Sequence, residues 1–396
     1  MNEQLVVKNF GPIKGATVDF KRVTVFIGPT GGGKSTLAKL AAVFRDDDGW
    51  MSEHNPENEK DDFEELLNKY LILDYRKADG NALWQADRDI VIYGINGLEH
   101  DDSKHKEIFK AGSDAFERIA ARGGIVDEFS IFSHATEKER RAMTGMYRRP
   151  LSVYYIPADR AFASALDSGL AGLALAGIAL PKALLSFLNE FKLAQNNLQM
   201  FPLDVPFLKL RYRMVDKQPR VELLGPNEVI ELEKGASGIQ SIIPMMLIIN
   251  NAIKRRSKQV VPYSFIIEEP ELNLYPTAQQ GLLNWLVEKC TKGENDLTIT
   301  THSPYILSHL NLLLYAYQVG NKDEEKRAKV KAIIPEEYWI NPDEFAAYYV
   351  NGPEGENGVR SLVDAETKLI SRNGLDTISG IQADQFDQLL DINSGF

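Results

Sequence analysis

The sequence predicts an α/β fold with a mixed or parallel central sheet, antiparallel strands at the N-terminus and an inserted helical subdomain. Three apolar runs, Val23–Ile27, Phe265–Ile267 and Leu297–Thr301, have the length and composition of buried strands. A polar motif follows each run, and segments with apolar residues at helical spacing lie between them. Because strands that alternate with helices usually lie parallel, we expect the three motifs to share one edge of the sheet.

Shorter patterns predict the remaining elements. They are two strands within Leu5–Phe20 around the turn Gly11-Pro12, a helix over Ser35–Phe44, a strand over Val153–Pro157, two helices within Ala161–Asn197 broken at Pro181, and a hairpin over Phe207–Leu224. The tail is polar, with amphipathic segments near Val359–Ile370 and Ile381–Ile392. Residues from Phe63 to about Arg149 mix helical and strand patterns without a clear motif.

These elements suggest four segments of chain. Residues 1–160 would form the first part of the central α/β domain, with an acidic, solvated insertion near residues 46–65. Residues 161–200 would form the helical insertion, residues 201–320 the second part of the central domain, and residues 321–396 an accessory segment. The Ala/Leu/Gly-rich helices of the insertion are equally well explained as its core or as a partner surface.

Composition excludes several classes of protein. The chain has 396 residues, of which 44% are hydrophobic, so it can bury a sizeable core. The formal charge of −11 argues against a constitutive nucleic-acid coat, although it leaves a local basic path open. With Cys290 as the one cysteine, no intramolecular disulfide can form, which favours a reducing, cytoplasmic compartment.

The sequence also predicts that the protein does not enter a membrane. Residues Met1–Gln4 do not resemble the start of a signal peptide. The most membrane-like stretch, Gly169–Leu180, is too short to cross a bilayer.

The motif after Val23–Ile27 is a phosphate-binding loop. Gly28 to Ser35 fits the pattern G-x-x-x-x-G-K-[ST] and lies between a predicted strand and a predicted helix. Its glycines let backbone N–H groups converge on phosphate oxygens, Lys34 can reach the terminal phosphates, and the Ser35 hydroxyl suits Mg²⁺. The sequence therefore predicts an ATP and Mg²⁺ site, with a simple glycine-rich turn as the alternative. The expected nucleotide-binding residues of this loop are Gly28, Gly31, Gly32, Gly33, Lys34, Ser35 and Thr36.

Two carboxylates follow the second apolar run. We assign Glu268 to the metal, through water, and Glu269 to orienting or deprotonating an attacking water molecule. The alternative is an acidic cluster at the N-terminus of a helix near Pro270.

His302 ends the third run, ahead of Ser303-Pro304. At the carboxyl end of a neighbouring strand it can bond to the γ-phosphate or to the attacking water, which makes it the second predicted catalytic residue. A purely structural histidine is the alternative.

A fourth motif is weaker. Ser237 and the Gly238 backbone can donate to a γ-phosphate from a helix N-terminus, and Gln240 belongs to the same segment. An ordinary helix cap over Gly235–Gly238 is the alternative.

With these sequence motifs, the chain resembles the ABC-type ATPases of the SMC, RecF and OLD group. Among them it looks most like the short bacterial antiphage-defence ATPases. The motifs that carry the resemblance are Val7–Ile13, Gly28–Ser35, Tyr155–Arg160, Ser237–Gln240, Ile267–Glu271 and Thr301–Pro304. The resemblance implies an ABC-type P-loop head that dimerises around two ATP molecules. Each nucleotide would lie between the phosphate loop of one subunit and Ser237-Gly238 of the other.

The chain departs from the family pattern at several points. Ile239 replaces the second glycine of the usual signature, and Glu268 stands where most relatives place Asp. Relatives carry a histidine-rich run where this chain has Glu271–Pro276, and Gln85 is a weak candidate for the Mg²⁺-sensing glutamine. After residue 305 the sequence contains no convincing combination of a glutamate with an Asp-x-Asp motif, so it does not predict a nuclease site there.

Two functions fit these features. The first is a cytoplasmic ATPase subunit of an antiphage (abortive infection) system, which senses infection and controls a separately encoded effector, expected to be a nuclease. The second is a RecF-like clamp in DNA repair, which needs a basic path. A transporter ATPase is disfavoured because no membrane partner is indicated.

Several basic segments are candidates for a path along DNA. They are Arg140-Arg141, Arg148-Arg149, the hairpin residues Lys209, Arg211, Arg213, Lys217 and Arg220, and Lys254–Lys258. Ordinary solvated surface is the alternative for each.

Arg160 is a further candidate. It follows a predicted strand and can approach the nucleotide or the subunit interface. A salt bridge at a helix N-terminus is the alternative.

Overall fold

A computed structural model describes residues 3–45, 69, 81–86, 92–94, 152–166, 180–225, 228–255, 262–351, 358–371, 382 and 384–390. The predicted acidic insertion, the arginine pairs at 140–141 and 148–149, most of the stretch 169–180 and residues 256–258 lie outside these ranges. Among the described residues, no helix combines the length and the apolar character that crossing a membrane requires.

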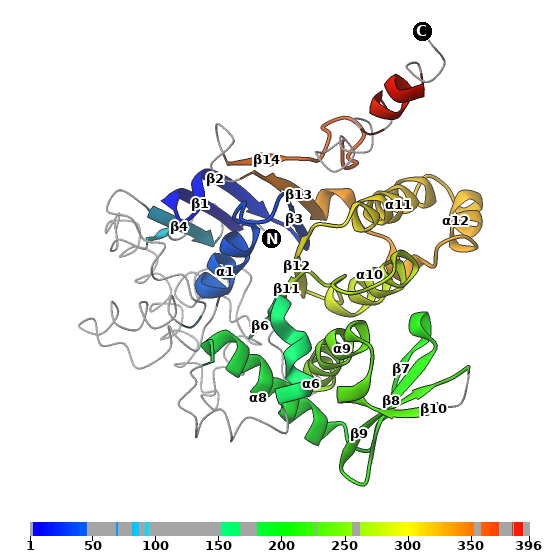
Figure 1. Cartoon of the computed structure of the whole chain (residues 1–396). Helices are drawn as coiled ribbons and strands as arrows, with labels where there is room; N and C mark the ends of the chain where they lie inside the picture. The colour runs from blue at the N-terminus through cyan, green and yellow to red at the C-terminus, as the bar shows by residue number, and fades with distance from the viewer. Residues whose placement is uncertain are drawn as a thin grey trace, which may run out of the picture.

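The centre of the molecule is a six-stranded sheet in the order β14-β13-β3-β12-β11-β6 (Figure 1). Five of its strands run parallel, and β14 pairs antiparallel with β13. The strands are β3 (Val23–Ile27), β6 (Ser152–Ile156), β11 (Tyr263–Glu268), β12 (Asp296–Thr301), β13 (Phe345–Val350) and β14 (Val359–Ser361). The predicted mixed α/β fold is confirmed.

The continuous apolar runs have a simple physical reason. Every residue of β3, β11 and β12 is buried. Helices cover both faces of the sheet, so neither face can be polar, unlike a strand with one face in water. Burying each such isoleucine or leucine stabilises the fold by about 1.5–3 kcal/mol.

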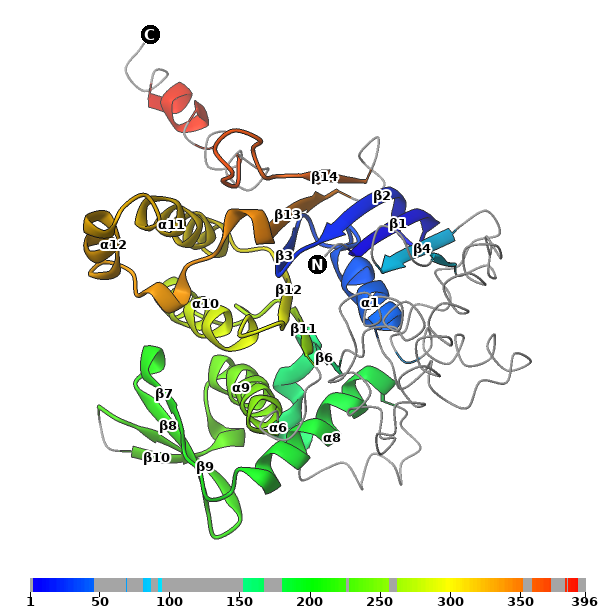
Figure 2. The same cartoon turned by 180° about the vertical axis from the view of Figure 1, so that it is seen from behind.

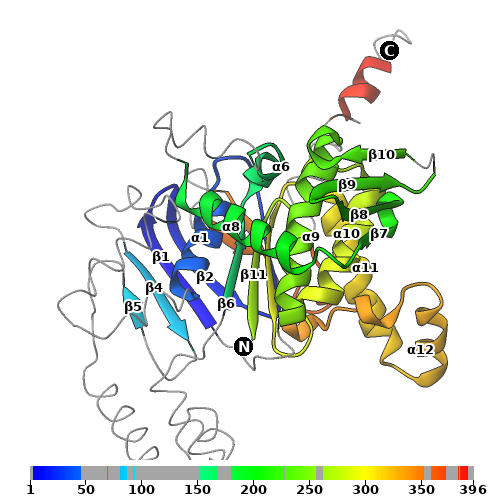
Figure 3. The same ribbon diagram turned by 90° about the horizontal axis from the view of Figure 1, so that it is seen from below.

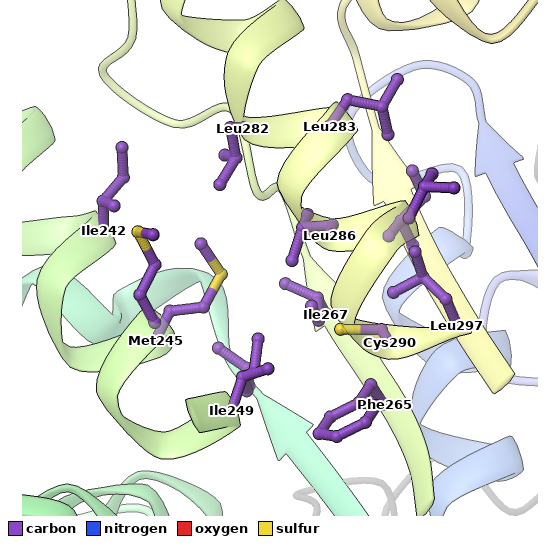
Figure 4. Packing of buried hydrophobic residues seen from close by; sticks show 14 of the residues in the cluster. Ile242, Met245, Ile249, Phe265, Ile267, Leu282, Leu283, Leu286, Cys290 and Leu297 are labelled. Atoms are coloured by element: carbon purple, nitrogen blue, oxygen red, sulfur yellow. The ribbon is translucent and has the colours of Figure 1, made fainter. Parts of the chain in front are cut away.

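Two cores lie on opposite faces of this sheet. On one face, α1 (Lys34–Arg45) packs with the N-terminal strands, where Phe26 and Ile266 join the core. On the other face lie α8 (Lys182–Asn197), α9 (Ser237–Arg255), α10 (Pro276–Cys290) and α11 (Pro304–Gly320). Figure 3 shows α1 and α9 on opposite sides of β11. Figure 4 shows Met245 and Ile249 of α9 and Leu286 of α10 packing around Ile267 of β11.

Two antiparallel sheets flank the centre. The first has the order β2-β1-β4-β5 and contains β1 (Glu3–Phe10), β2 (Ile13–Phe20), β4 (Asn81–Ala86) and β5 (Ile92–Gly94). It confirms the predicted N-terminal antiparallel strands. The second has the order β10-β9-β8-β7, from β7 (Leu203–Val205), β8 (Leu210–Val215), β9 (Gln218–Leu223) and β10 (Glu228–Glu231). Its β8–β9 pair is the predicted hairpin (Figure 2).

The segment division stays a prediction, but one strand bears on it. β13 comes from the predicted accessory segment 321–396, and it pairs in parallel with β3 in the central sheet. The described residues also form helices α6 (Phe162–Leu166) and α12 (Glu324–Lys331), five short 3-10 helices and a helix over residues 384–390. The last of these stands clear of the sheet in Figures 1 and 2.

Candidate active site

The loop between β3 and α1 is tightly packed, which explains its glycines. A Cβ atom built on Gly28 would lie 2.0 Å from the carbonyl oxygen of Val350, at the end of β13. On Gly33, whose φ is +108°, a Cβ would lie 2.8 Å from Cγ1 of Ile13. Side chains are therefore excluded at both positions, and the loop is held against neighbouring strands. Gly31 and Gly32 lie between them on the same turn.

Lys34 is buried at the first position of α1. Its Nζ donates to the carbonyl oxygens of Gly28 and Pro29, each at 2.9 Å. Burial lowers the pKa of Lys34, and the carboxylates of Glu269, Glu271 and Glu268 partly offset this effect. The ammonium therefore lies near three carboxylates while its bonds run to the loop backbone.

The next two residues have different surroundings. Ser35 is exposed at the helix N-terminus, whereas Thr36 is buried against the core. The first N–H groups of a helix have no partner within it, so this terminus is suited to binding an anion.

Glu268 ends β11 and is 6% exposed. Its Oε2 accepts a bond from the Ala158 N–H at 3.4 Å, while its Oε1 is buried without a hydrogen-bond partner. An orphaned carboxylate oxygen is the kind of ligand that Mg²⁺ takes. The described ranges hold no group of three or more His, Cys, Asp or Glu arranged for a metal. Since Mg²⁺ usually takes one or two carboxylates plus substrate phosphates, Glu268 and Ser35 fit such an ion.

Glu269 has an unusual backbone. Its φ is +42°, in the left-handed region that costs an L-residue about 1–2 kcal/mol. Its N–H donates to the carbonyl oxygen of Thr300 at 3.0 Å, which ties the turn to β12. Its Oε1 lies 3.1 Å from Nε2 of His302. The turn after β11 thus directs the second carboxylate toward the histidine.

His302 lies between this carboxylate and the lysine. Its Nδ1 is 3.5 Å from Nζ of Lys34, and its Nε2 faces Glu269. An ammonium can only donate, so Nδ1 is assigned as the acceptor and Nε2–H as the donor to Glu269. The three predicted residues Lys34, Glu269 and His302 therefore meet at the carboxyl edge of the sheet.

Glu271 was not predicted as a site residue, although it belongs to the Glu-Glu-Pro-Glu motif. It is buried, and its Oε1 accepts bonds from the His302 N–H at 3.0 Å and from the Thr301 hydroxyl. Burial raises its pKa, which the Thr301 and His302 bonds partly oppose. Its place two residues after Glu269 was the one available signal. Glu271 fixes the backbone from which His302 projects.

Arg160 has partners that the sequence analysis did not anticipate. Its Nη1 donates to the carbonyl oxygen of Glu268 and its Nη2 to that of Glu269, each at 2.6 Å. The side chain is fully buried, and burial lowers its pKa to about 10, so it stays a cation at neutral pH. These charge-assisted bonds are each worth about 1.5–3 kcal/mol, enough to offset the strain at Glu269.

The fourth motif lies apart from this cluster. Ser237 is exposed at the start of α9, and a Cβ on Gly238 would lie 2.7 Å from the carbonyl oxygen of Asn273. The side chain of Gln240 donates to the carbonyl oxygens of Glu233 and Gly235, at 2.9 and 2.7 Å. Within one chain these residues contact their own turn and the loop after β11, on the face of the sheet opposite to α1.

Two further candidates are placed only in part. Gln85 lies in β4, opposite Gln4 of β1, and its side chain is outside what the structure describes. In the β8–β9 hairpin, Arg211 pairs with Asp204, Arg213 with Glu222 and Arg220 with Glu231. These three arginines of the basic face therefore have acidic partners in their own sheet.

Comparison with known proteins gives one family match. Residues 182–307 match the AAA ATPase domain model, about a third of the chain. The match includes Ser237, Glu268, Glu269 and His302 and leaves out the phosphate loop. No curated protein matches the sequence.

Two SMC heads are among the solved structures that are similar to this chain. One is the Smc head domain of Pyrococcus furiosus with an extended coiled coil, bound to the C-terminal domain of ScpA. It is 13% identical, with a TM-score of 0.37, over 96% of this chain and 98% of that chain. The other is the SMC head domain from Thermotoga maritima, 13% identical with a TM-score of 0.33, over 78% of this chain and 92% of that chain.

Proposed function

We propose that the chain binds ATP with Mg²⁺ and hydrolyses it to ADP and phosphate. The observation that carries the proposal is the meeting of Lys34, Glu269 and His302 at the edge of three adjacent parallel strands, where His302 lies 3.5 Å from Nζ of Lys34 and 3.1 Å from Oε1 of Glu269. The match of residues 182–307 to an ATPase domain model supports it.

The residues have separate tasks in this reaction. Lys34 exchanges the carbonyl oxygens of Gly28 and Pro29 for phosphate oxygens, while the N-terminus of α1 binds the remaining phosphate charge. Ser35 and Glu268 would hold Mg²⁺, Glu268 through water, and the ion would neutralise charge on the phosphates. Glu269 orients the attacking water and accepts its proton. Once Lys34 has moved, His302 Nδ1 is free to accept a hydrogen bond from the attacking water.

Phosphate release by the purified protein tests this proposal. Wild type should release phosphate from ATP only with Mg²⁺, while Lys34→Ala should lose nucleotide binding and turnover together. A wild-type protein that binds no ATP at millimolar concentration would rule the proposal out.

We further propose that the complete site forms between two copies of the chain. Ser237 is exposed and lies on the face of the sheet opposite to α1, so in this arrangement it would serve the nucleotide of a second subunit. The mass of Glu269→Gln in Mg·ATP, by light scattering, should be at least twice that of the nucleotide-free protein. Ser237→Arg should keep that variant monomeric, and a monomeric Glu269→Gln in ATP contradicts the shared site.

For the biological role, we propose the ATPase subunit of an antiphage system that controls a separately encoded effector, expected to be a nuclease. The motif set supports this role, and the paired arginines of the β8–β9 hairpin disfavour the DNA-repair clamp. The test is to tag Glu269→Gln and identify what co-purifies in Mg·ATP from a host that expresses its genomic neighbours. A stoichiometric second protein supports effector control, and DNA without a protein partner supports the clamp.

A further inference from the structure

We propose that Arg160 is a positioning residue for the carboxylate pair: its guanidinium holds the turn that sets the directions of Glu268 and Glu269. This inference rests on the proposed ATPase activity. In the proposed role, Arg160 neither contacts the nucleotide nor forms a surface salt bridge.

The first support is the choice of atoms that Arg160 contacts. Its Nη1 and Nη2 bond to two consecutive backbone carbonyl oxygens, each at 2.6 Å, and Nη1 also bonds to that of Pro157 at 3.1 Å. A planar fork holds its donors at a fixed spacing and in one plane, whereas an ammonium, such as that of Lys34 on the carbonyls of Gly28 and Pro29, carries its donors on a single rotating atom and constrains peptide orientation less. The contact therefore constrains peptide orientation and leaves the carboxylates of Glu268 and Glu269 available for other partners.

The second support is the place where the fork binds. Between the two bonded carbonyls the backbone passes through the left-handed conformation of Glu269, at φ +42°. A strained residue persists only where surrounding contacts determine it. The bonds of Arg160 on one side and the bond to Thr300 on the other fix this peptide. Together they direct the carboxylate of Glu269 to within 3.1 Å of His302.

The third support is that Arg160 connects a third strand to the site. It lies in the 3-10 turn Ala158–Ala161 that follows β6, and β6 pairs in parallel with β11. The same turn offers the Ala158 N–H to Oε2 of Glu268. The end of β6 therefore supports both carboxylates, one through a backbone N–H and both through the guanidinium.

The test compares Arg160→Lys with wild type. Lysine keeps the charge and loses the fork, so kcat should fall roughly 10- to 100-fold, as expected for a displaced catalytic group. The dissociation constant of a fluorescent ATP analogue should change less than about threefold, because the hydrogen bonds of Arg160 run to Pro157, Glu268 and Glu269 and not to the residues of the phosphate loop. A crystal structure of the variant should show Glu269 outside the left-handed region. Wild-type kcat in Arg160→Lys, or an unchanged φ at Glu269, would overturn the inference.

Two controls separate positioning from general loss of structure. Arg45→Lys replaces the other fully buried arginine in the described part of the chain, which bonds to side chains at the opposite end of the sheet. It should lower the Tm while leaving kcat per nucleotide-binding site unchanged. Arg160→Gly should regain activity when millimolar guanidinium is added, and methylammonium should not restore it. Equal rescue by both cations would show that charge alone matters and would overturn the inference, whereas an inactive wild type would instead refute the proposed ATPase.

Discussion

The two ends of the central sheet both bury cations, but they use them differently. At the amino end, Arg45 pairs with Asp296 of β12 at 2.9 Å and with Glu3 of β1. At the carboxyl end, Lys34 and Arg160 donate to backbone carbonyl oxygens, and Lys34 also faces Nδ1 of His302. The amino end pairs its carboxylates with an arginine, whereas at the carboxyl end neither Glu268 nor Glu269 forms an ion pair with a lysine or arginine among the described residues.

This difference separates stability from function. Paired charges in a low-dielectric interior hold elements together, and removing one partner leaves an uncompensated charge. Unpaired carboxylate oxygens, such as Oε1 of Glu268, cost stability unless a ligand occupies the site. The comparison predicts that mutations at the carboxyl end change turnover, and that mutations at the amino end change the free energy of unfolding.

The largest expected effect is that of Glu269→Gln. The amide keeps the size of the side chain and cannot accept a proton, so turnover should fall roughly 10²- to 10⁴-fold. The side chain is partly exposed and bonds to His302, so the free energy of unfolding should change by less than about 1 kcal/mol. Phosphate release and urea unfolding measure the two effects. Turnover within fivefold of wild type would show that the carboxyl end does not activate water through this residue.

Arg45→Met should have the opposite profile. It leaves Asp296 buried without its cation, which should cost about 3–5 kcal/mol of unfolding free energy. At a temperature where the variant stays folded, ATP turnover per nucleotide-binding site should equal that of wild type. A variant as stable as wild type would mean that this ion pair contributes nothing, and the contrast between the ends would be lost.

The strands and the meeting of the motifs were predictable from sequence because each rests on a local pattern. Continuous apolar residues mark β11 and β12, and parallel strands bring the residues that follow them, Glu269 and His302, to one edge. The amino-end cluster has no such pattern, since Glu3, Arg45 and Asp296 come from three distant segments.

Contacts to backbone atoms could not be predicted from the sequence either. Arg160 bonds to carbonyl oxygens, which every residue possesses, so no residue type marks its partners. The left-handed φ of Glu269 was also unpredictable, because that conformation usually favours glycine or asparagine. The position of β13 beside β3 depends on pairing across more than 300 residues of chain.

The contribution of the amino end to the free energy of unfolding should depend on pH. Burial raises the pKa of Asp296 to about 6, an effect that Arg45 partly opposes, from its usual 3.8. The pKa of Asp296 is higher in the folded state than in the unfolded state, so the folded state binds this proton more tightly. The contribution of Asp296 to the free energy of unfolding is therefore fully present below about pH 4 and is lost as the pH rises through 6. The free energy of unfolding of wild type relative to Asp296→Asn should therefore fall by up to about 3 kcal/mol between pH 4 and 6. A difference that rises over this range would contradict the assigned direction.

Glu344→Gln should have the smallest effect and tests whether burial, and not position, makes the amino end important. Glu344 pairs with Arg22 at 3.1 Å near the starts of β13 and β3, but its side chain is 44% exposed. Exposed pairs contribute about 0–1 kcal/mol because solvent screens them, so urea unfolding should shift by no more than that and turnover should be unchanged. The substitution matches Glu269→Gln in chemistry and Arg45→Met in location. A loss as large as that of Arg45→Met would show that any charge at this edge supports the sheet, whether or not it is buried.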